Sequence, residues 1–491
     1  MLTAVGNGLW SGFRFLMAHL FFVNIILSLV IVFFQRRSPK TVWAWLLLLY
    51  FLPLLGFVLY LVVGQDFHKS RLFKGKEVEE AVRYAADRQE ERICRQQLCA
   101  VRPELHRFRR QILYNLEAGA SVLTDNNAVE IYTDGSAFYE ALRREMERAE
   151  RYIHLQSYII RRDEVWEQIE KVLEKKAAEG VEVRVLFDSM GCRTMRRTDW
   201  KRLEDKGIRT AEFFPALFGR LQLRPNYRNH RKITVIDGSV GFVGGFNIGR
   251  EYTGADPAFG YWRDTHLCIE GAAVTTLAMR FVMDWNYAAG ENLFLEDRLF
   301  EIGTYRKEGK DSVQIISSGP DSAIRTIHDN YVSLIYNARS HVYLQTPYLV
   351  PDDSVLDALK TAARSGIDVR IIVPCKPDHP FVYWATYSYL GELVAAGAKC
   401  YFYQNGFLHA KMLTADGLAG SVGTANMDIR SFELNFEVNA VIYSAETVGC
   451  LEKVFEKDLE NCTELTEEHY AGRGYGIRIK EQVSRLLSPL L

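Results

Sequence analysis

The feature that most constrains the fold of this 491-residue chain is an internal repeat. Short segments of the first half recur in the second half in the same order. The matching segments are 153–158 with 342–347, 180–186 with 366–372, and 203–207 with 393–397. Their offsets are 189, 186 and 190 residues, so the order is kept with small insertions and deletions. A chain that repeats itself in this way is expected to fold as two homologous units.

Each unit is expected to be an α/β domain. Arg151–Ile160 and Glu182–Asp188 are rich in apolar and β-branched residues, and the helix-like segment Val165–Ala178 lies between them. Alternating strands and helices indicate a sheet flanked by helices. We therefore predict two homologous domains, each a mixed sheet flanked by helices, with a junction near residue 315 at a turn-like stretch.

Each copy of the repeat ends on the same arrangement of polar residues. The first copy has His230, Lys232, Asp237 and Asn247, and the second has His409, Lys411, Asp416 and Asn426. In both copies the aspartate follows the histidine by seven positions and the asparagine follows the aspartate by ten. One such motif alone would indicate an ordinary core histidine beside a solvated lysine. Two copies with identical spacing indicate a paired functional site.

The chemistry of such a site follows from strand geometry. Residues i and i+2 of a strand point to the same face, so each histidine would project beside its lysine. Two facing pairs would form a cationic pocket with two imidazoles, which suits a phosphodiester. The lysines, helped by Asn247 and Asn426, would bind the non-bridging oxygens. One neutral imidazole would attack phosphorus, while the other, protonated, would donate to the leaving alkoxide and then deprotonate the incoming hydroxyl.

These motifs resemble the twin H-x-K-x4-D motifs of the phospholipase D superfamily, and the resemblance covers roughly residues 120–465. Together with two apolar N-terminal runs and the terminal Ser488–Leu491, they make the chain similar to the bacterial cardiolipin synthases. The resemblance implies a two-domain fold with both motifs meeting in one site at the interface. It also implies His230 as the nucleophile and His409 as the acid/base. The sequence itself is symmetric and assigns neither role.

Four carboxylates have predicted roles in the site. Asp237 and Asp416 are grouped with the catalytic residues of the motifs, although their strand parity is opposite to that of the histidines. We expect them to act indirectly, and a plain turn role beside a glycine explains them nearly as well. Asp264 and Glu437 align at equivalent strand starts, where the resemblance implies an acid that hydrogen-bonds the catalytic imidazole. An ordinary solvated strand end is an equally good explanation of these two.

The N-terminal residues 1–65 are predicted to form a two-helix transmembrane hairpin. The runs Phe15–Phe34 and Val42–Val63 contain 20 and 22 residues without a formal charge, and about 20 apolar residues cross a hydrocarbon core as a helix. More basic residues lie just outside the hairpin than in its turn, which favours cytoplasmic termini. We therefore expect a multi-pass protein of the cell membrane with catalytic domains on the cytoplasmic side. A charged connector (66–115) and domains at 116–315 and 316–491 would follow.

The amino-acid composition limits the classes of molecule that the protein is expected to bind. Lys and Arg total 60 and Asp and Glu total 61, a balance that argues against a general nucleic-acid binder. The eight scattered cysteines fit a reducing compartment. The histidines are paired with lysines, which repel cations, and no cluster has ligand spacing, so no metal and no cofactor are expected. The resemblance implies a membrane and a phospholipid substrate, phosphatidylglycerol, as the partners.

The function that the resemblance implies is transfer of a phosphatidyl group from one phosphatidylglycerol to another, with release of glycerol, through a phosphohistidine. Hydrolysis of a phospholipid by the same site is the alternative, because water would attack the same intermediate. A nuclease or other phosphodiesterase shares the motif, but the apolar hairpin and neutral charge argue against it. A non-enzymatic membrane scaffold is disfavoured because both motifs are intact.

Two further segments combine apolar and basic residues. Pro215–Arg224 is an insertion relative to the second copy, and it could guide a lipid headgroup or fold back onto its own domain. Near the C-terminus, Ile479, Val483 and Leu486 follow a helical stripe flanked by basic residues. The stripe predicts a helix that docks on a membrane or on the second domain, and the pattern alone does not choose between them.

Overall fold

The computed structural model describes residues 19–33, 39–63, 89, 103–215, 226–300 and 305–488. The chain divides into two compact units, Met1–Ser70 with Ala216–Tyr227, and Arg71–Pro215 with Arg228–Leu491. The insertion at 216–224 and almost all of the predicted connector before residue 103 lie outside the described residues.

The described part of the N-terminal unit is helical at residues 19–33 and in α2 (Pro39–Phe51) and α3 (Pro53–Val63). The second apolar run is therefore divided at Leu52, because Pro53 has no N–H to bond the Leu49 carbonyl. Asn24 supplies the missing donor: its Nδ2 donates to the carbonyl of Leu49 at 3.1 Å and to that of Pro53 at 3.0 Å. Within the described residues, no helix combines the length and the apolar character needed to cross a membrane.

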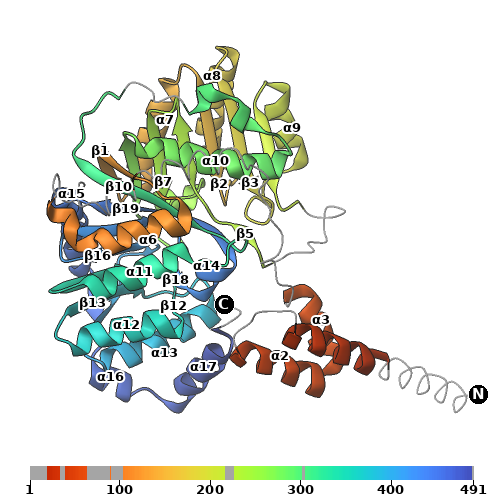
Figure 1. The fold of residues 1–491 in the computed structure, drawn as a ribbon, viewed down its shortest axis with the longest axis vertical. Helices are drawn as coiled ribbons and strands as arrows, with labels where there is room; N and C mark the ends of the chain where they lie inside the picture. Colours follow the sequence, from red (N-terminus) through yellow and green to blue (C-terminus); the bar gives the residue numbers. More distant parts are fainter. Residues whose placement is uncertain are drawn as a thin grey trace, which may run out of the picture. The chain divides into compact units, whose positions relative to one another are not determined.

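The second unit is built around one mixed sheet of 16 strands (Figure 1). In the first half the strands are β1 (Leu123–Tyr132), β2 (Tyr152–Ser157), β3 (Glu182–Asp188), β4 (Arg209–Phe213), β5 (Arg228–Asn229), β6 (Ile233–Ile236), β7 (Val240–Gly244), β8 (Trp262–Arg263) and β9 (His266–Glu270). In the second half they are β10 (Asp311–Ser318), β11 (His341–Gln345), β12 (Leu349–Val350), β13 (Asp368–Pro374), β14 (Lys399–Tyr403), β15 (Phe407–Leu408), β16 (Met412–Ala415), β17 (Ala419–Gly423), β18 (Met427–Asp428), β19 (Asn435–Tyr443) and β20 (Cys462–Glu464). The short strands β8, β12, β15 and β18 form two separate pairs, β12 with β18 and β8 with β15.

The sheet shows the duplication directly. Outward from β1 the order is β9, β7, β6, β2, β3, β4, and outward from β10 it is β19, β17, β16, β11, β13, β14, with β20 added at the edge. β1 and β10 pair antiparallel at the centre and join the two copies. The predicted α/β fold with duplicated domains is therefore confirmed. The exact domain boundaries stay predictions, and β10 crosses the one placed at 315/316.

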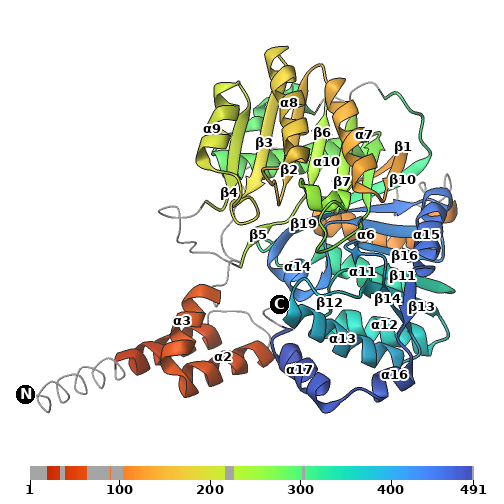
Figure 2. The same cartoon turned by 180° about the vertical axis from the view of Figure 1, so that it is seen from behind.

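Helices follow the same duplicated plan. The first half has α7 (Gly135–Glu147), α8 (Glu164–Ala178), α9 (Arg197–Asp205) and α10 (Ala273–Ala289), and the second has α11 (Thr326–Asn337), α12 (Asp353–Arg364), α13 (Pro380–Val394), α14 (Ile429–Glu433), α15 (Ala445–Leu459), α16 (Glu467–Ala471) and α17 (Tyr475–Leu486). Short 3₁₀ turns lie at Pro103–Phe108, Arg250–Thr253, Leu293–Leu295 and Asp297–Leu299. In the first half, α10 lies on one face of the sheet and α7 and α8 on the other (Figures 1 and 2).

One helix departs from the expected connector. α6 (Arg109–Gly119) belongs to a stretch that we predict to be a charged connector up to residue 115. Instead Phe108, Ile112 and Leu116 are buried in the hydrophobic core of the second half, beside Ile327 and Tyr331 of α11. The chain therefore packs against its second copy before it enters β1. Burial of these apolar side chains stabilises α6 in this position.

Candidate active site

Exchanged strand pairs bring the two motifs together. β5, just before His230, pairs in parallel with the start of β19 in the other half, and β15, just before His409, pairs in parallel with β8. The backbone N–H of His230 donates to the Phe436 carbonyl at 2.9 Å, and that of His409 donates to the Arg263 carbonyl at 2.7 Å. Each histidine therefore lies beside the residue that comes directly after its backbone partner. That residue is Glu437 for His230 and Asp264 for His409.

Each imidazole is bonded to a buried carboxylate of the other half. His230 Nδ1 lies 3.0 Å from both oxygens of Glu437, and His409 Nδ1 lies 2.5 Å from Asp264 Oδ2. Both carboxylates are fully buried, whereas the two histidine side chains keep 12% and 11% of their surface exposed. An ionised carboxylate only accepts, so each Nδ1 that bonds its carboxylate carries a proton and its Nε2 keeps a lone pair. Lys411 Nζ is a second neighbour of His409 Nδ1, at 2.7 Å.

Asp264 and Glu437 occupy equivalent places in the register of the two copies. Gly244 of β7 opposes His266 of β9, and Gly423 of β17 opposes Asn439 of β19. Asp264 and Glu437 each stand two positions before these partners. The exchange between halves could not be read from the alignment, because the alignment shows which acids are equivalent and not which histidine each one meets.

Burial and the two lysines set the protonation of the site. Burial lowers the pKa of both imidazoles, and that of His409 falls to about 4 with Lys411 acting in the same direction. Although burial alone would raise the pKa of Asp264 and Glu437, the nearby lysine charges and the hydrogen bonds from the histidines hold both pKa values below the usual one. The free site thus holds two neutral imidazoles and two carboxylate anions near pH 7.

The lysines lie within the same buried site. Lys232 Nζ donates to the His230 carbonyl at 2.7 Å and lies 5.4 Å from the ring centre of Tyr158. Lys411 Nζ donates to the His409 carbonyl and lies 3.9 Å from Asp264 Oδ2. Burial lowers the pKa of Lys232 well below its usual value and that of Lys411 to about 8. Each lysine also affects the pKa of the other motif's histidine, as expected for one shared site.

The structure does not bring Asp237 and Asp416 to the histidines. Asp237 accepts hydrogen bonds from the backbone N–H groups of residues 150, 151 and 152, each at 2.8 Å. Asp416 does the same for residues 339, 340 and 341 at 2.8 to 2.9 Å. The strands β6 and β16 lie between each histidine and its aspartate, so the carboxylates lie at the end of the strand opposite to the histidines. Their grouping with the catalytic residues is replaced by a structural role at a turn, where both have a positive φ.

The two asparagines are held differently. Asn247 Oδ1 accepts from the Ile159 N–H at 3.1 Å, and its Nδ2 donates to the Tyr252 hydroxyl at 2.8 Å. These bonds use both ends of the amide for the protein itself, so binding of substrate oxygens would rest on one remaining N–H. Asn426 is also buried, but its Oδ1 has no hydrogen-bond partner among the described residues. The two asparagines are predicted to bind substrate in the same way, but their hydrogen-bond surroundings differ.

Sequence reasoning missed the glycine that makes room for one carboxylate. A Cβ at Gly245 would lie 1.9 Å from Asp264 Oδ1, so no larger residue fits while Asp264 holds His409. The equivalent residue, Thr424, has a hydroxyl that accepts from the Val438 N–H at 2.9 Å. The signal available in the sequence was the alignment of the two copies. It places glycine in one copy at the position that threonine occupies in the other.

Sequence reasoning also missed an arginine anchor behind Asp264. The side chain of Arg263 crosses to the second half, where its NH2 group lies 2.8 Å from Asp458 Oδ2. Asp458 also accepts from Gln345 at 2.8 Å. Aromatic rings complete the walls: Tyr158 lies 5.0 Å from His230, and Trp262 lies 5.1 Å from His409, between ring centres. These contacts restrict the position of the imidazoles and their carboxylates.

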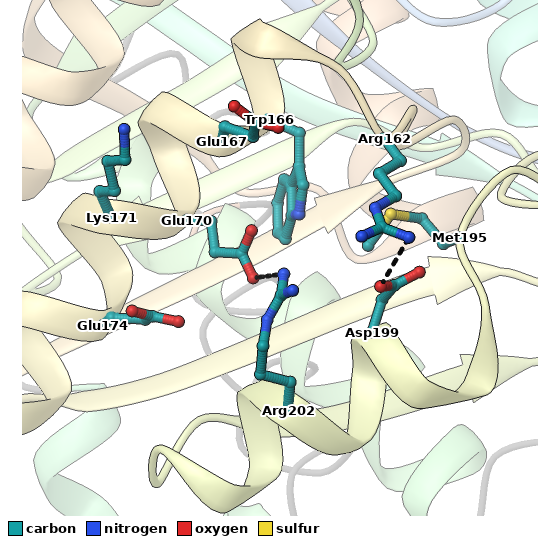
Figure 3. Close-up of a pocket in the computed structure, with 9 residues that line it drawn as sticks. All are labelled: Arg162, Trp166, Glu167, Glu170, Lys171, Glu174, Met195, Asp199 and Arg202. Carbon is teal, nitrogen blue, oxygen red and sulfur yellow. Dashed lines mark hydrogen bonds and ion pairs between the residues drawn. The ribbon is translucent and has the colours of Figure 1, made fainter.

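No group of three or more His, Cys, Asp or Glu side chains among the described residues is arranged to hold a metal ion. A groove of about 250 Å³ lies between α8 and α9, and it contains none of the motif residues (Figure 3). Its charges are largely paired, with Arg202 bonded to Glu170 at 2.5 Å and Arg162 to Asp199 at 3.2 Å. We therefore assign the chemistry to the histidine site.

A duplicated α/β sheet with two histidine–lysine motifs meeting in one site defines the phospholipase D superfamily. The model of the "Cardiolipin synthase, PLD-like domain" matches residues 142–269 and 331–459, and the "Phospholipase_D-nuclease N-terminal" model matches residues 22–65. The chain belongs to the cardiolipin synthase family of this superfamily, and it is a phosphatidyltransferase.

Named relatives are similar in sequence to almost the whole of this chain. A cardiolipin synthase of Oceanobacillus iheyensis is 43% identical and covers 96% of this chain and 98% of its own. A cardiolipin synthase of Listeria monocytogenes is 44% identical, with 97% and 99% covered, and cardiolipin synthase 2 of Staphylococcus epidermidis is 44% identical, with 97% and 98% covered. The crystal structure of a phosphatidylserine synthase from Haemophilus influenzae has the same fold, with a TM-score of 0.60 at 14% identity over 78% of this chain and 100% of that one.

Proposed function

We propose that the enzyme moves the phosphatidyl group of one phosphatidylglycerol onto a hydroxyl of a second, forming cardiolipin and releasing glycerol. The observation that carries this proposal is the exchanged pairing of each imidazole with a buried carboxylate of the other half. It gives two histidines with the same Nδ1–H tautomer in one lysine-lined site. Such a site can break and remake a phosphodiester with a nucleophile and a proton donor of the same residue type.

In the first step His230 Nε2 attacks phosphorus and the bond to the glycerol oxygen breaks. His409 Nε2 must then carry a proton and give it to that oxygen. Although the pKa of His409 is low in the free site, an anionic phosphodiester placed beside it favours the protonated imidazole. The charge on the phosphoryl oxygens is stabilised by Lys232 and Lys411. The products of this step are free glycerol and a phosphatidyl group bonded to His230.

In the second step His409, now neutral, takes the proton of a hydroxyl on the second phosphatidylglycerol. The oxygen attacks phosphorus, the P–N bond to His230 breaks, and His409 is protonated again. Glu437 balances the positive charge that forms on His230 in both steps, and Asp264 does the same for His409. Water in place of the second lipid would give a phosphatidic acid, so the choice of acceptor separates transfer from hydrolysis.

The membrane setting is part of the proposal. The N-terminal residues 1–65 would anchor the enzyme as a helical hairpin in the cell membrane, with the catalytic unit on the cytoplasmic side. The two uncharged apolar runs support it, as does the match to the N-terminal family model over residues 22–65. Large apolar side chains of the helices also face outward, with Phe33 and Phe51 73% and 74% exposed, as lipid-facing residues would be.

Purified full-length enzyme with phosphatidylglycerol as the sole lipid tests this function. We expect cardiolipin and free glycerol in equal amounts. Phosphatidic acid and glycerol without cardiolipin would show a hydrolase instead. His230→Ala and His409→Ala should each lose at least roughly 10²-fold in rate. His341→Gln is the matched control, because His341 is bonded to Glu452 at the Asp416 end of the strands and should leave turnover intact.

A further inference from the structure

The C-terminal helix α17 presents its apolar side chains outward. Tyr475, Ile479, Val483 and Leu486 are 83%, 64%, 48% and 82% exposed. With 3.6 residues per turn these four positions form a single stripe along the helix. A helix that packs on a protein core buries such a stripe. In α17 the stripe faces away from the catalytic unit, so core packing, one of the two explanations left open by the sequence, does not account for it.

The opposite face of α17 is polar and firmly held. Glu481 is completely buried and accepts from Arg473 at 2.7 Å and from the Tyr470 hydroxyl at 3.1 Å. Ser484, one turn further on, is also buried, and Arg485 pairs with Glu392 of α13. A buried, paired carboxylate is costly to turn outward. The orientation of the helix is therefore fixed. The polar contacts of its inner face hold the apolar stripe outward, so loose packing is not the reason for its exposure.

Basic residues flank the stripe on both sides. At 100° per residue, Arg478 lies on one flank of Ile479 and Lys480 lies on the other. Arg478 and Lys480 are exposed, and the only acidic residue of the helix, Glu481, is buried and paired. The outward surface of α17 is thus apolar along its centre and positive along its edges. An occupant that matches it is apolar and negatively charged at its surface.

We propose that α17 is an interfacial helix that inserts its stripe into the surface of an anionic phospholipid bilayer. A second copy of the chain would bring two basic edges together. Residues 19–63 contain no Asp or Glu, so the N-terminal helices offer no charge complement. Because the proposed substrate is an anionic lipid, docking by α17 would hold the catalytic unit against the surface that contains it, and in this sense the inference rests on the proposed function.

The test uses full-length enzyme in vesicles of phosphatidylcholine with phosphatidylglycerol. A polarity-sensitive dye is attached at Ile479→Cys, or at Leu418→Cys as the matched control, in a protein whose exposed native cysteines are replaced by serine. Like Ile479, Leu418 is an exposed aliphatic side chain. It follows Asp416 at the end of the strand far from His409. We expect a blue shift at residue 479, quenching by lipids that carry a quencher, and neither effect at residue 418.

Two results would overturn the inference. One is a dye at residue 479 that stays in water, as at residue 418. The other is a blue shift without quenching by labelled lipids, because that would show cover by protein, either a second copy or the N-terminal helices. The readout needs no turnover and can be repeated in the His230→Ala protein, so it is independent of the proposed reaction.

Activity gives a second measurement. The triple variant Ile479→Ser, Val483→Ser and Leu486→Ser changes only exposed side chains, so the fold should persist. We expect a loss of about tenfold on bilayers, because the buried apolar area and the charge attraction both set interfacial binding. The rate on a short-chain, water-soluble substrate should not change. Equal losses on both substrates would show a structural role for the stripe and contradict docking.

Discussion

Asp264→Asn should separate the two chemical steps of the enzyme. The substitution keeps the size of a fully buried side chain whose Oδ2 lies 2.5 Å from His409 Nδ1, and it removes the negative charge. The neutral amide can still contact the imidazole, but it cannot balance an imidazolium. We therefore expect His409 to fail as the proton donor and acceptor while the rest of the site stays in place.

The size of the loss follows from the geometry. A hydrogen bond to a charged group contributes about 1.5–3 kcal/mol, and two charges about 4 Å apart at an effective dielectric constant of 20 attract by about 4 kcal/mol. A loss of 3–5 kcal/mol from the transition state lowers kcat by roughly 10²- to 10⁴-fold. Glu437→Gln should cause a loss of similar size, since Glu437 has the same relation to His230.

A short-chain phosphodiester with a nitrophenol leaving group tells the two variants apart. Nitrophenolate departs without a proton, so the Asp264→Asn enzyme should release one equivalent in a burst and then stall with phosphorus on His230. The Glu437→Gln enzyme should show no burst, because its nucleophile is impaired. Glu270→Gln is the matched control, since Glu270 is a buried acid at the far end of β9.

A burst in Glu437→Gln with none in Asp264→Asn would refute the assignment of His230 as the nucleophile. Near-normal turnover in both variants would refute the exchanged carboxylate–histidine pairs as the basis of the reaction.

Three further predictions follow from the site. Gly245→Ala should lower kcat by about 10²-fold, because the new methyl group displaces Asp264 and a shift of about 1 Å is enough for such a loss; Gly449→Ala, where no atom lies within 4 Å of the new carbon, should have no effect, and equal rates for the two variants would contradict the packing argument. Burial lowers the pKa of Lys411 to about 8, so its positive charge is lost as pH rises and kcat/KM measured against pH should fall above about pH 8; a profile that stays flat well beyond that pH would exclude Lys411 as a source of charge. Activity should survive a chelator, because the lysines supply the charge that a metal would give, and complete loss restored by one divalent ion would disprove this.

The sequence predicted the parts of the site better than their partners. Matched spacing pointed to His230 and His409, and alignment of the repeats gave Asp264 and Glu437 equivalent positions in the two copies. The exchange of these acids between halves depends on the β5–β19 and β8–β15 pairs, which join segments about 150 to 200 residues apart in the chain and leave no local pattern.

Other misses have local causes. Asp237 was grouped with the catalytic residues because it belongs to the motif, although strand parity argued against direct contact and a turn role beside Gly238 explained it nearly as well; the structure shows the turn role. The break at Leu52 was predictable from Pro53, since proline removes a helix hydrogen bond, whereas its compensation by Asn24 required knowing which helices meet. The exposed stripe of α17 has the same sequence pattern as a core-packed helix, and the exposure of the stripe together with the burial of Glu481 distinguishes the two.

The antiparallel β1–β10 pair has a consequence for the history of the enzyme. In an assembly of two identical chains, symmetry would give both histidines identical surroundings, and either could act first. Here the two copies lie on one chain and share one sheet, so each position has been free to change without its counterpart. Gly245 corresponds to Thr424, and Asp264 corresponds to the longer Glu437. Fusion of the copies thus permits a division of labour that a symmetric dimer of the same fold could not sustain.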